Sequence, residues 1–297
     1  MAVSGEVGIP FAVDAAGHRF GRSAIDRSPQ PFRKPLSCAG CKLLVTAVAG
    51  YTTGSGRHTS SHYRRHPGVH HDASCPYDFD RQVQVLVGAD STALERERSG
   101  HYRLVLPDEL QAQPPHDPPG TYRRRRASIV VRRADAPRLS AAINSAVKVA
   151  RLLERFDHMP QALEAFTVRS GRSAIAWRDF CYLPDRYDEL ASRLSTDRTR
   201  LPVAVSGIAQ ARGVASAGTS YWLMHDPSQR VQLDGSAAYL RLRIRSRSEA
   251  VLERVTDGQR FFALGWCGRL DAGKSRGGHR RCDLNMWINS AAGICSW

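Results

Sequence analysis

The chain has 297 residues, of which 43 are basic and 28 acidic, so its formal net charge is +15. No apolar run approaches the ~18 residues that a membrane-spanning helix needs. The N-terminus lacks the pattern of a secretory signal, and seven cysteines in a chain this long do not resemble a disulfide framework. We therefore expect a cytoplasmic protein with no membrane partner. Its positive charge predicts a polyanionic partner, most often nucleic acid, and the alternative is a basic surface with no dedicated partner.

In chain order, the sequence predicts an α+β protein made of five segments. These are an N-terminal arm (1–30), a small zinc-binding module (31–106), a linker with one strand (107–136), a short helical section (137–200) and a C-terminal five-stranded antiparallel barrel (201–297). The linker is predicted because residues 107–120 contain five prolines and a glycine, which cannot form a helix. Arg123, Arg124, Arg125 and Arg126 follow, and then a strand-like run at 128–131.

The zinc-binding module is predicted from cysteines and histidines at metal-ligand spacing. Cys38 and Cys41 form a C-x-x-C pair, and His71 and Cys75 form an H-x3-C pair about thirty residues later. Three thiolates and one imidazole in a tetrahedral arrangement favour structural Zn²⁺. His70 and His62 are alternatives to His71. Buried free thiols beside a solvated histidine-rich loop are the other interpretation.

A resemblance supports the metal interpretation. The C-x-x-C pair, the run His62-Tyr-Arg-Arg-His66 and the final Cys75-Pro-Tyr-Asp78 are similar to the zinc module at the front of competence CoiA-like proteins. The similarity covers about residues 32–80. In that family the module precedes a nuclease domain, whose acidic pair and lysine we do not find in this sequence. The resemblance therefore implies zinc and a nucleic-acid context, without nuclease chemistry.

Three helices are predicted in the middle of the chain. Apolar residues from Leu139 to Leu153 recur at helical spacing after Pro137, which suits a first helical turn. A second helix is predicted at Gln161–Phe166. A third is predicted from Asp185, as its N-cap, through Leu194.

After residue 201 the pattern changes to short strands separated by turns. Strands are predicted at Val203–Ile208, Ser220–Met224, Tyr239–Ile244, Arg260–Trp266 and Leu284–Ile288. Their order, together with the glycines at 258 and 265, resembles an OB-fold barrel over about residues 201–297. Another small antiparallel barrel is the alternative.

The segment Gly268–Ser275, GRLDAGKS, matches the phosphate-loop pattern G-x-x-x-x-G-K-[ST]. A working phosphate loop must open into a helix. Here two glycines follow, and then a strand only about eight residues later. The segment is therefore predicted to be a hairpin loop.

One predicted strand has an arginine face. Because side chains alternate across a strand, Arg241, Arg243, Arg245 and Arg247 share one face, opposite Leu240, Leu242 and Ile244. Without a counter-ion these cations repel one another, and a phosphate backbone would relieve that repulsion. A solvated edge strand is the alternative. Further predicted contacts are Arg123–Arg126, Lys274, and Trp222 as a base-stacking residue.

The sequence thus predicts a nucleic-acid-binding protein with structural zinc that favours single-stranded DNA or RNA. Two alternatives remain open at this point. One is a metal-dependent nuclease with a dispersed acidic site drawn from Asp179, Asp185, Asp188 and Glu189. The other is a protein-interaction adaptor whose arginines contact an acidic protein partner. No spacing of Ser, His, Cys and Asp indicates hydrolase catalysis.

Overall fold

The computed structural model describes residues 7–54, 56, 58–89, 93–107, 110, 136–196, 202–214, 221–225, 230–233, 236–268, 270–274, 280–288 and 290–297. The chain forms two compact units. The first comprises Met1–Arg103 and Lys148–Thr167, and the second comprises Leu104–Val147 and Val168–Trp297. Arg123–Arg126 and the strand predicted at 128–131 lie outside the described residues. Within the described ranges, no helix is both long enough and apolar enough to cross a membrane.

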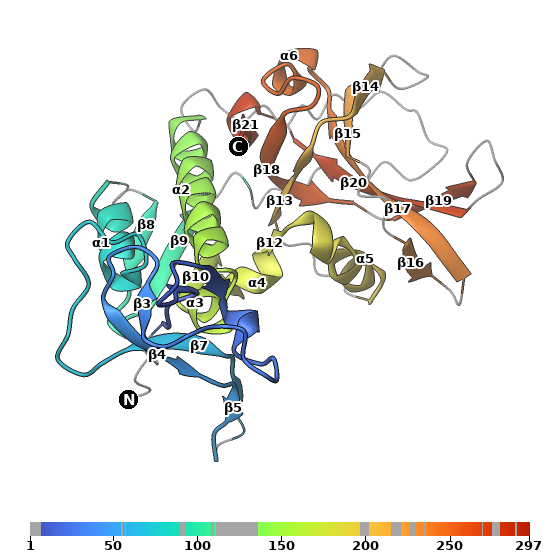
Figure 1. The fold of residues 1–297 in the computed structure, drawn as a ribbon. Coiled ribbons are helices and arrows are strands. Elements are labelled where there is room, and N and C mark those ends of the chain that lie inside the picture. Colours follow the sequence, from blue (N-terminus) through green and yellow to red (C-terminus); the bar gives the residue numbers. More distant parts are fainter. Residues whose placement is uncertain are drawn as a thin grey trace. The chain divides into compact units, whose positions relative to one another are not determined.

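The first unit is built on an antiparallel sheet with strand order β2-β1-β3-β4-β7 (Figure 1). Its strands are β1 (Phe11–Val13), β2 (Arg19–Gly21), β3 (Leu36–Cys38), β4 (Leu44–Val48) and β7 (His62–Arg65). The short strands β5 (Tyr51–Thr52) and β6 (His58–Thr59) pair between β4 and β7 in the chain. Cys38 and Cys75 belong to the same buried core as Leu36, Val45 and Tyr63. Cys38 lies in β3, and Cys75 packs in the core beside it, so two of the predicted zinc ligands belong to one buried cluster.

A helix that the sequence analysis did not predict, α1 (Phe79–Ala89), follows directly after Cys75. Phe79 and Val83 are four residues apart, so they lie on one helical face, and both are buried. The side chain of Asp78 accepts a hydrogen bond from the backbone N–H of Arg81 at 3.2 Å, which caps the start of the helix. Phe79 packs edge-on against Phe156, with ring centroids 5.1 Å apart. This packing fixes the chain immediately after the cysteine.

Two of the three predicted helices begin where the pattern placed them. They are α2 (Ala136–Arg155) and α3 (Pro160–Glu164), although Phe166 starts a strand instead of ending α3. The third, α5 (Tyr187–Thr196), follows a 3-10 turn, η3 (Pro184–Arg186). Asp185 therefore lies within this turn and is not the N-cap that the sequence predicted.

A four-stranded sheet has the order β11-β10-β9-β8. Its strands are β8 (Leu94–Arg96), β9 (Tyr102–Leu106), β10 (Phe166–Ser170) and β11 (Ser173–Ala176). The division into units passes through β9, β10 and α2. The short helix α4 (Trp177–Phe180) then leads into the second unit's large sheet.

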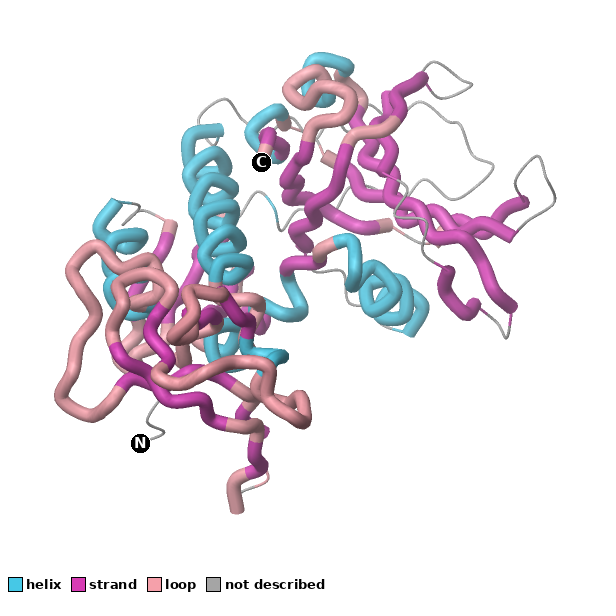
Figure 2. The backbone as a smooth tube through the Cα atoms, viewed as in Figure 1, coloured by secondary structure: helices cyan, strands magenta, loops and turns pink. Residues whose placement is uncertain are grey.

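The second unit contains a ten-stranded sheet with the main order β12-β13-β18-β20-β17-β15-β14 (Figures 1 and 2). Its strands are β12 (Cys181–Tyr182), β13 (Pro202–Ile208), β14 (Ala211–Val214), β15 (Tyr221–His225), β16 (Arg230–Leu233), β17 (Ser236–Ser246), β18 (Arg260–Cys267), β19 (Asp271–Lys274), β20 (Arg280–Trp287) and β21 (Ile294–Ser296). The helix α6 (Glu249–Leu252) follows β17. Beneath one face of the sheet, Leu240, Leu242 and Ile244 form the centre of a core with Leu284 and Met286.

The mixed α+β class agrees with the prediction, but a single five-stranded OB-like barrel is not confirmed. Among the described strands the sheet is open, and two neighbouring pairs, β12–β13 and β17–β20, are parallel where an antiparallel barrel was expected. The five predicted strands all exist. The barrel prediction differs from the observed sheet because an alternating pattern identifies a strand but not the strands that pair with it. Strand pairing is selected by packing between residues far apart in the sequence.

Candidate metal centre and candidate nucleic-acid interface

Four side chains of the first unit, Cys38, Cys41, His71 and Cys75, place one sulfur or nitrogen atom each within 4.8 Å of all the others. The Sγ atoms of Cys38 and Cys75 are 3.8 Å apart, and Cys41 Sγ lies 3.2 Å from His71 Nδ1. Sulfur atoms around a tetrahedral zinc with ~2.3 Å bonds are ~3.8 Å apart. The cluster can therefore hold a tetrahedral metal ion.

Backbone amides surround the sulfurs of this Cys3His cluster. The N–H groups of Gly40 and Tyr77 each lie 3.4 Å from a cysteine sulfur, Cys38 and Cys75 respectively. A Cβ atom at Gly40 would lie 2.9 Å from Cys75 Sγ and 2.8 Å from Pro76, so only glycine allows this approach. Burial raises the pKa of the Cys38 and Cys75 thiols above the ordinary value. Bound metal would supply the positive charge that thiolates need in such a buried place.

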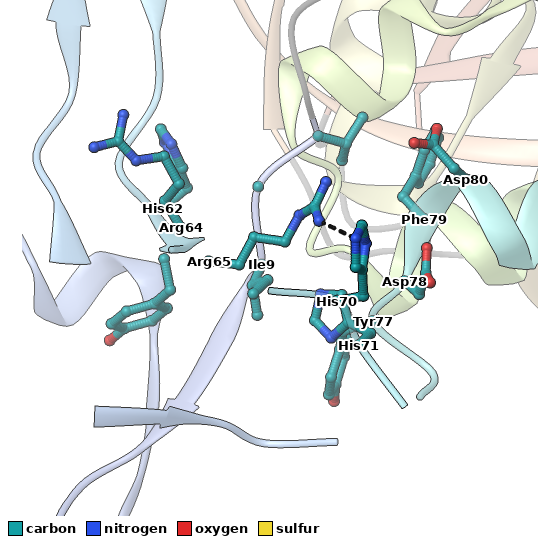
Figure 3. Close-up of a pocket in the computed structure, with 13 residues that line it drawn as sticks. Ile9, His62, Arg64, Arg65, His70, His71, Tyr77, Asp78, Phe79 and Asp80 are labelled. Carbon is teal, nitrogen blue, oxygen red and sulfur yellow. Dashed lines mark hydrogen bonds between the residues drawn. The ribbon is translucent and has the colours of Figure 1, made fainter. Parts of the chain in front are cut away.

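Of the three histidines that the sequence left open, the structure brings His71 to the cysteines. His70 instead lies 3.2 Å from Arg65 Nη1, and His62 Nδ1 lies 2.8 Å from the carbonyl oxygen of Ser60. All three line a cavity of about 190 Å³, shown in Figure 3, whose walls also include Arg64 and Asp80. None of the three cysteines lines this cavity, so it is distinct from the interior of the Cys3His cluster.

In the second unit, β17 and β20 lie side by side and present polar residues on one face. Leu240, Leu242 and Ile244 are fully buried on the other face, as the alternation predicted. The polar face of β17 carries Arg241, Arg243 and Arg245. Each of them has a partner in β20: Arg241 pairs with Asp283, Arg243 with Asn285 and Arg245 with Trp287. We call this surface the arginine–tryptophan face, and it includes Arg281 of β20 and Trp222 of β15. Arg247 lies beyond the end of β17 and is exposed.

An internal counter-ion, Asp283, lies among the arginines. Its carboxylate is 2.9 Å from Arg241, 3.2 Å from Arg243 and 3.3 Å from Arg281, and its side chain is only 3% exposed. Burial lowers the pKa of Arg243, and the neighbouring cations Arg241, Arg281 and Arg245 lower it further. The carboxylate of Asp283 acts in the opposite direction and raises this pKa in part. From the sequence alone, the arginines were expected to repel one another because no counter-ion was apparent. In the structure, the carboxylate of Asp283 neutralises part of their positive charge, and among the described side chains the arginines still outnumber it.

Two tryptophans accompany the arginines in this face. Trp222 and Trp287 are paired with Arg245 from opposite sides, in β15 and β20. The guanidinium carbon of Arg243 lies 5.4 Å from the Trp222 ring centroid, and that of Arg245 lies 4.8 Å from the Trp287 centroid, both within cation–π range. Both rings are partly exposed. Tyr221, adjacent to Trp222, packs instead against the buried core, so only Trp222 of this pair lies on the polar face.

Arg281 and Asp283 were not among the predicted site residues, although the sequence carries a signal for them. In β20, Arg281, Asp283, Asn285 and Trp287 alternate with Cys282, Leu284 and Met286, which are fully buried. The strand was predicted to start only at Leu284, so the charged half of its polar face was overlooked. Lys274 is the last residue of β19, and its side chain lies outside what the structure describes.

The segment GRLDAGKS forms no phosphate loop in the described residues. Its second half is strand β19, which pairs antiparallel with β20. This agrees with the hairpin prediction, with the refinement that residues 271–274 belong to a strand and not to the loop.

The acidic residues of the nuclease alternative do not form a metal-ligand group in the part of the chain that the structure describes, where the Cys3His cluster is the only such group. Glu189 pairs with Arg186 at 2.7 Å and with Arg178 at 3.4 Å. Because Arg186 donates hydrogen bonds to it, the pKa of the Glu189 carboxyl lies below its ordinary value. Glu189 therefore has a structural partner.

No protein-family model and no curated protein matches the chain, so the resemblance to CoiA-like proteins is not shown. Among solved structures, a small single-stranded DNA-binding protein from Streptomyces coelicolor is 11% identical, with a TM-score of 0.23 over 33% of this chain and 95% of that chain. One from Mycoplasma pneumoniae is 8% identical, with a TM-score of 0.17 over 29% and 88%. Fission yeast Pot1 with ssDNA is 10% identical, with a TM-score of 0.19 over 35% and 38%. Because these TM-scores are low, neither the fold nor the function of this chain is inferred from them.

Proposed function

We propose that this protein binds single-stranded nucleic acid through the arginine–tryptophan face of its second unit. The observation that carries the proposal is the gathering of Arg241, Arg243 and Arg281 around one buried carboxylate, beside two partly exposed tryptophans that contact Arg243 and Arg245. The excess positive charge attracts phosphates, and binding releases the counter-ions condensed on them. Tryptophan rings and guanidinium planes stack on bases. Because stacking needs unpaired bases, single strands are favoured over duplex.

Fluorescence anisotropy with labelled single strands of 20–30 nucleotides, titrated over a series of salt concentrations, tests this proposal. The variant Arg245→Glu is expected to weaken binding about tenfold or more and to flatten the salt dependence by ~0.7 in log–log slope for each phosphate that the protein no longer neutralises. Arg172→Glu is the matched control, since it changes the net charge equally at an exposed turn between β10 and β11. Its binding should stay close to wild type.

Three results distinguish the proposal from its alternatives. Equal loss of affinity in both variants would show that net charge, and not this face, determines binding. A shortened probe on a denaturing gel after incubation with Mg²⁺ would favour a nuclease. Absence of binding at low salt would contradict a nucleic-acid partner and favour a protein partner of acidic character.

We also propose that Cys38, Cys41, His71 and Cys75 hold a structural Zn²⁺. The donor set and the burial of two of the cysteines support this assignment, and four protein ligands leave no position for a catalytic water. Metal analysis of the purified protein should give about one zinc per chain. Cys75→Ser should lose it, while His70→Ala, one residue from His71, should retain it. Loss of zinc from His70→Ala alone would contradict the assignment of His71.

A further inference from the structure

Three guanidinium groups of the arginine–tryptophan face converge on a single point. Arg241, Arg243 and Arg281, which we call the arginine trio, come from two adjacent parallel strands, and all three lie within 3.3 Å of Asp283. Among the side chains that the structure describes, one carboxylate lies among three guanidiniums, which leaves an excess of two positive charges. Asp271 of β19 is the cross-strand partner of Asp283, and its side chain lies outside what the structure describes. This arrangement differs from arginines spaced along a strand, each of which could meet a different phosphate.

The carboxylate lies beneath the arginines and does not block them. Asp283 is 3% exposed, whereas the side chains of Arg241, Arg243 and Arg281 are 16%, 23% and 31% exposed. Each guanidinium carries five N–H donors, and one carboxylate accepts only about four hydrogen bonds. Asp283 alone therefore cannot accept hydrogen bonds from all the donors of the trio. In the described part of the chain, Nε of Arg243 is buried without a hydrogen-bond partner.

The segment GRLDAGKS borders the arginine trio. Gly273 of β19 is paired with Arg281, and a Cβ atom at Gly273 would lie 3.7 Å from Arg281 Nη2. The guanidinium thus lies close to the backbone of this edge strand. The described part of the segment that resembles a phosphate loop in sequence therefore lies beside a cationic cluster, and it is a strand and not a nucleotide-binding loop.

The charge of the trio matches one kind of phosphate in a nucleic acid. An internal phosphodiester carries one negative charge, whereas a terminal phosphate monoester carries about −1.5 to −2 at neutral pH and offers three acceptor oxygens. The excess of two positive charges among the described side chains and the converging donors suit such a dianion. Arg245 lies four residues from Arg241 along β17, or about 13 Å, and this distance leaves room for the first nucleotides beside Trp222 and Trp287.

Building on the proposed function, we propose that the arginine trio binds the terminal phosphate of a single strand, while the tryptophans stack the adjacent bases. The protein then recognises a phosphorylated strand end in preference to the interior of a strand. Asp283 acts as a positioning residue that holds the three guanidiniums together.

The test compares three probes of one sequence that carry a 5′-phosphate, a 3′-phosphate or hydroxyl groups at both ends, each labelled away from the end compared. Anisotropy is measured at pH 7.5 and constant ionic strength, where the monoester is mostly dianionic. One phosphorylated probe is expected to bind about tenfold more tightly than the hydroxyl probe, as charge-assisted hydrogen bonds to one added group imply. The phosphorylated probe that binds more tightly shows whether the 5′ or the 3′ end of the strand is recognised.

Variants at Arg281 and Arg245 separate the contribution of the trio from that of the rest of the face, and a variant at Asp283 tests its positioning role. Arg281→Gln should reduce the preference for the phosphorylated probe to about one, while Arg245→Gln should weaken all probes by a similar factor and keep the preference. Asp283→Asn should lose the preference as well, even though it adds positive charge, because the arginines are no longer held together. A preference that increases in Asp283→Asn would overturn the positioning role. Circular dichroism checks that each variant is folded.

Equal affinity for all three probes, with binding that still depends on Arg245, would overturn recognition of a strand end and leave the proposed function standing. Absence of binding to every probe at low salt would contradict both.

Discussion

At the scale of single residues, close approach at the Cys3His cluster depends on one glycine. Gly40 separates Cys38 from Cys41, and its missing side chain leaves space for Cys75 and Pro76. Gly40 lies inside the C-x-x-C pair, and its backbone N–H is 3.4 Å from Cys38 Sγ. The contact with Cys75, distant in sequence, could not be predicted from the pattern.

Gly40→Ala is therefore expected to weaken metal retention and to lower the thermal stability of the first unit, because the new methyl group would lie under 3.0 Å from Pro76 and Cys75. Competition with a colorimetric zinc chelator measures the change in metal affinity, for which we expect at least a tenfold loss. Gly54→Ala is the control, since nothing lies within 4 Å of a Cβ atom there. Equal metal affinity in the two variants would show that the cluster tolerates the methyl group.

A second residue-scale prediction concerns Glu189, which accepts hydrogen bonds from Arg186 at 2.7 and 3.1 Å. The pair lowers the pKa of this carboxyl in the folded state. The Arg186–Glu189 pair therefore stabilises the fold fully above the pKa of the unfolded chain, ~4.3, and this stabilisation is lost as pH falls through the lower pKa of the folded state. Since the carboxylate is 41% exposed, Glu189→Gln should cost only ~0.5 kcal/mol at neutral pH. Urea unfolding at several pH values should show the difference from wild type shrinking below about pH 4.5. The exposed Glu253→Gln is the control, and a difference that persists at pH 3 would contradict the mechanism.

At the scale of elements, β17 has two faces with different tasks. One face packs Leu240, Leu242 and Ile244 into the core, and the other carries arginines. The alternation that defines these faces was readable from the sequence. The neighbours of β17 were not, because β20 joins it in parallel from about forty residues further along the chain and brings Asp283 with it.

Substitutions on the two faces should therefore separate stability from binding. Leu242→Ala removes a fully buried side chain and should lower the free energy of unfolding by ~2–5 kcal/mol. Arg245→Gln, on the opposite face, should leave that free energy nearly unchanged and weaken nucleic-acid binding severalfold. Chemical denaturation and anisotropy on both proteins measure the two effects. A large stability loss in Arg245→Gln would show that its contact with Trp287 is mainly structural.

At the scale of the whole molecule, the chain divides its two candidate sites between two compact units. The Cys3His cluster belongs to the first unit and shares its core, while the arginine–tryptophan face belongs to the second. The net charge of +15 is that of the whole chain. Function and metal content are thus expected to respond to different perturbations.

Removal of the metal with a chelator is expected to loosen the first unit selectively, since metal binding contributes folding free energy where the ligands are part of the core. Hydrogen exchange followed by mass spectrometry should show faster exchange in peptides around Leu36, Val45 and Tyr63. Peptides from β17 and β18 should exchange as before. The same experiment on Cys75→Ser, without chelator, is the control for effects of the chelator itself. Unchanged exchange in the first unit would contradict a structural role for the metal.

The sequence by itself determined those features that depend on residues close together in the chain. These are the C-x-x-C and H-x3-C pairs, the five strands after residue 201, the helix that became α2, and the arginine and leucine faces of β17. Each follows from local spacing, because side-chain direction repeats every two or 3.6 residues. Only the tertiary structure decided which histidine meets the cysteines, that the strands expected to form a barrel make an open mixed sheet in the described residues, and that Asp283 lies beneath three arginines. These features join residues about thirty to forty positions apart, and such contacts are selected by packing and charge across the whole fold, which no local pattern encodes.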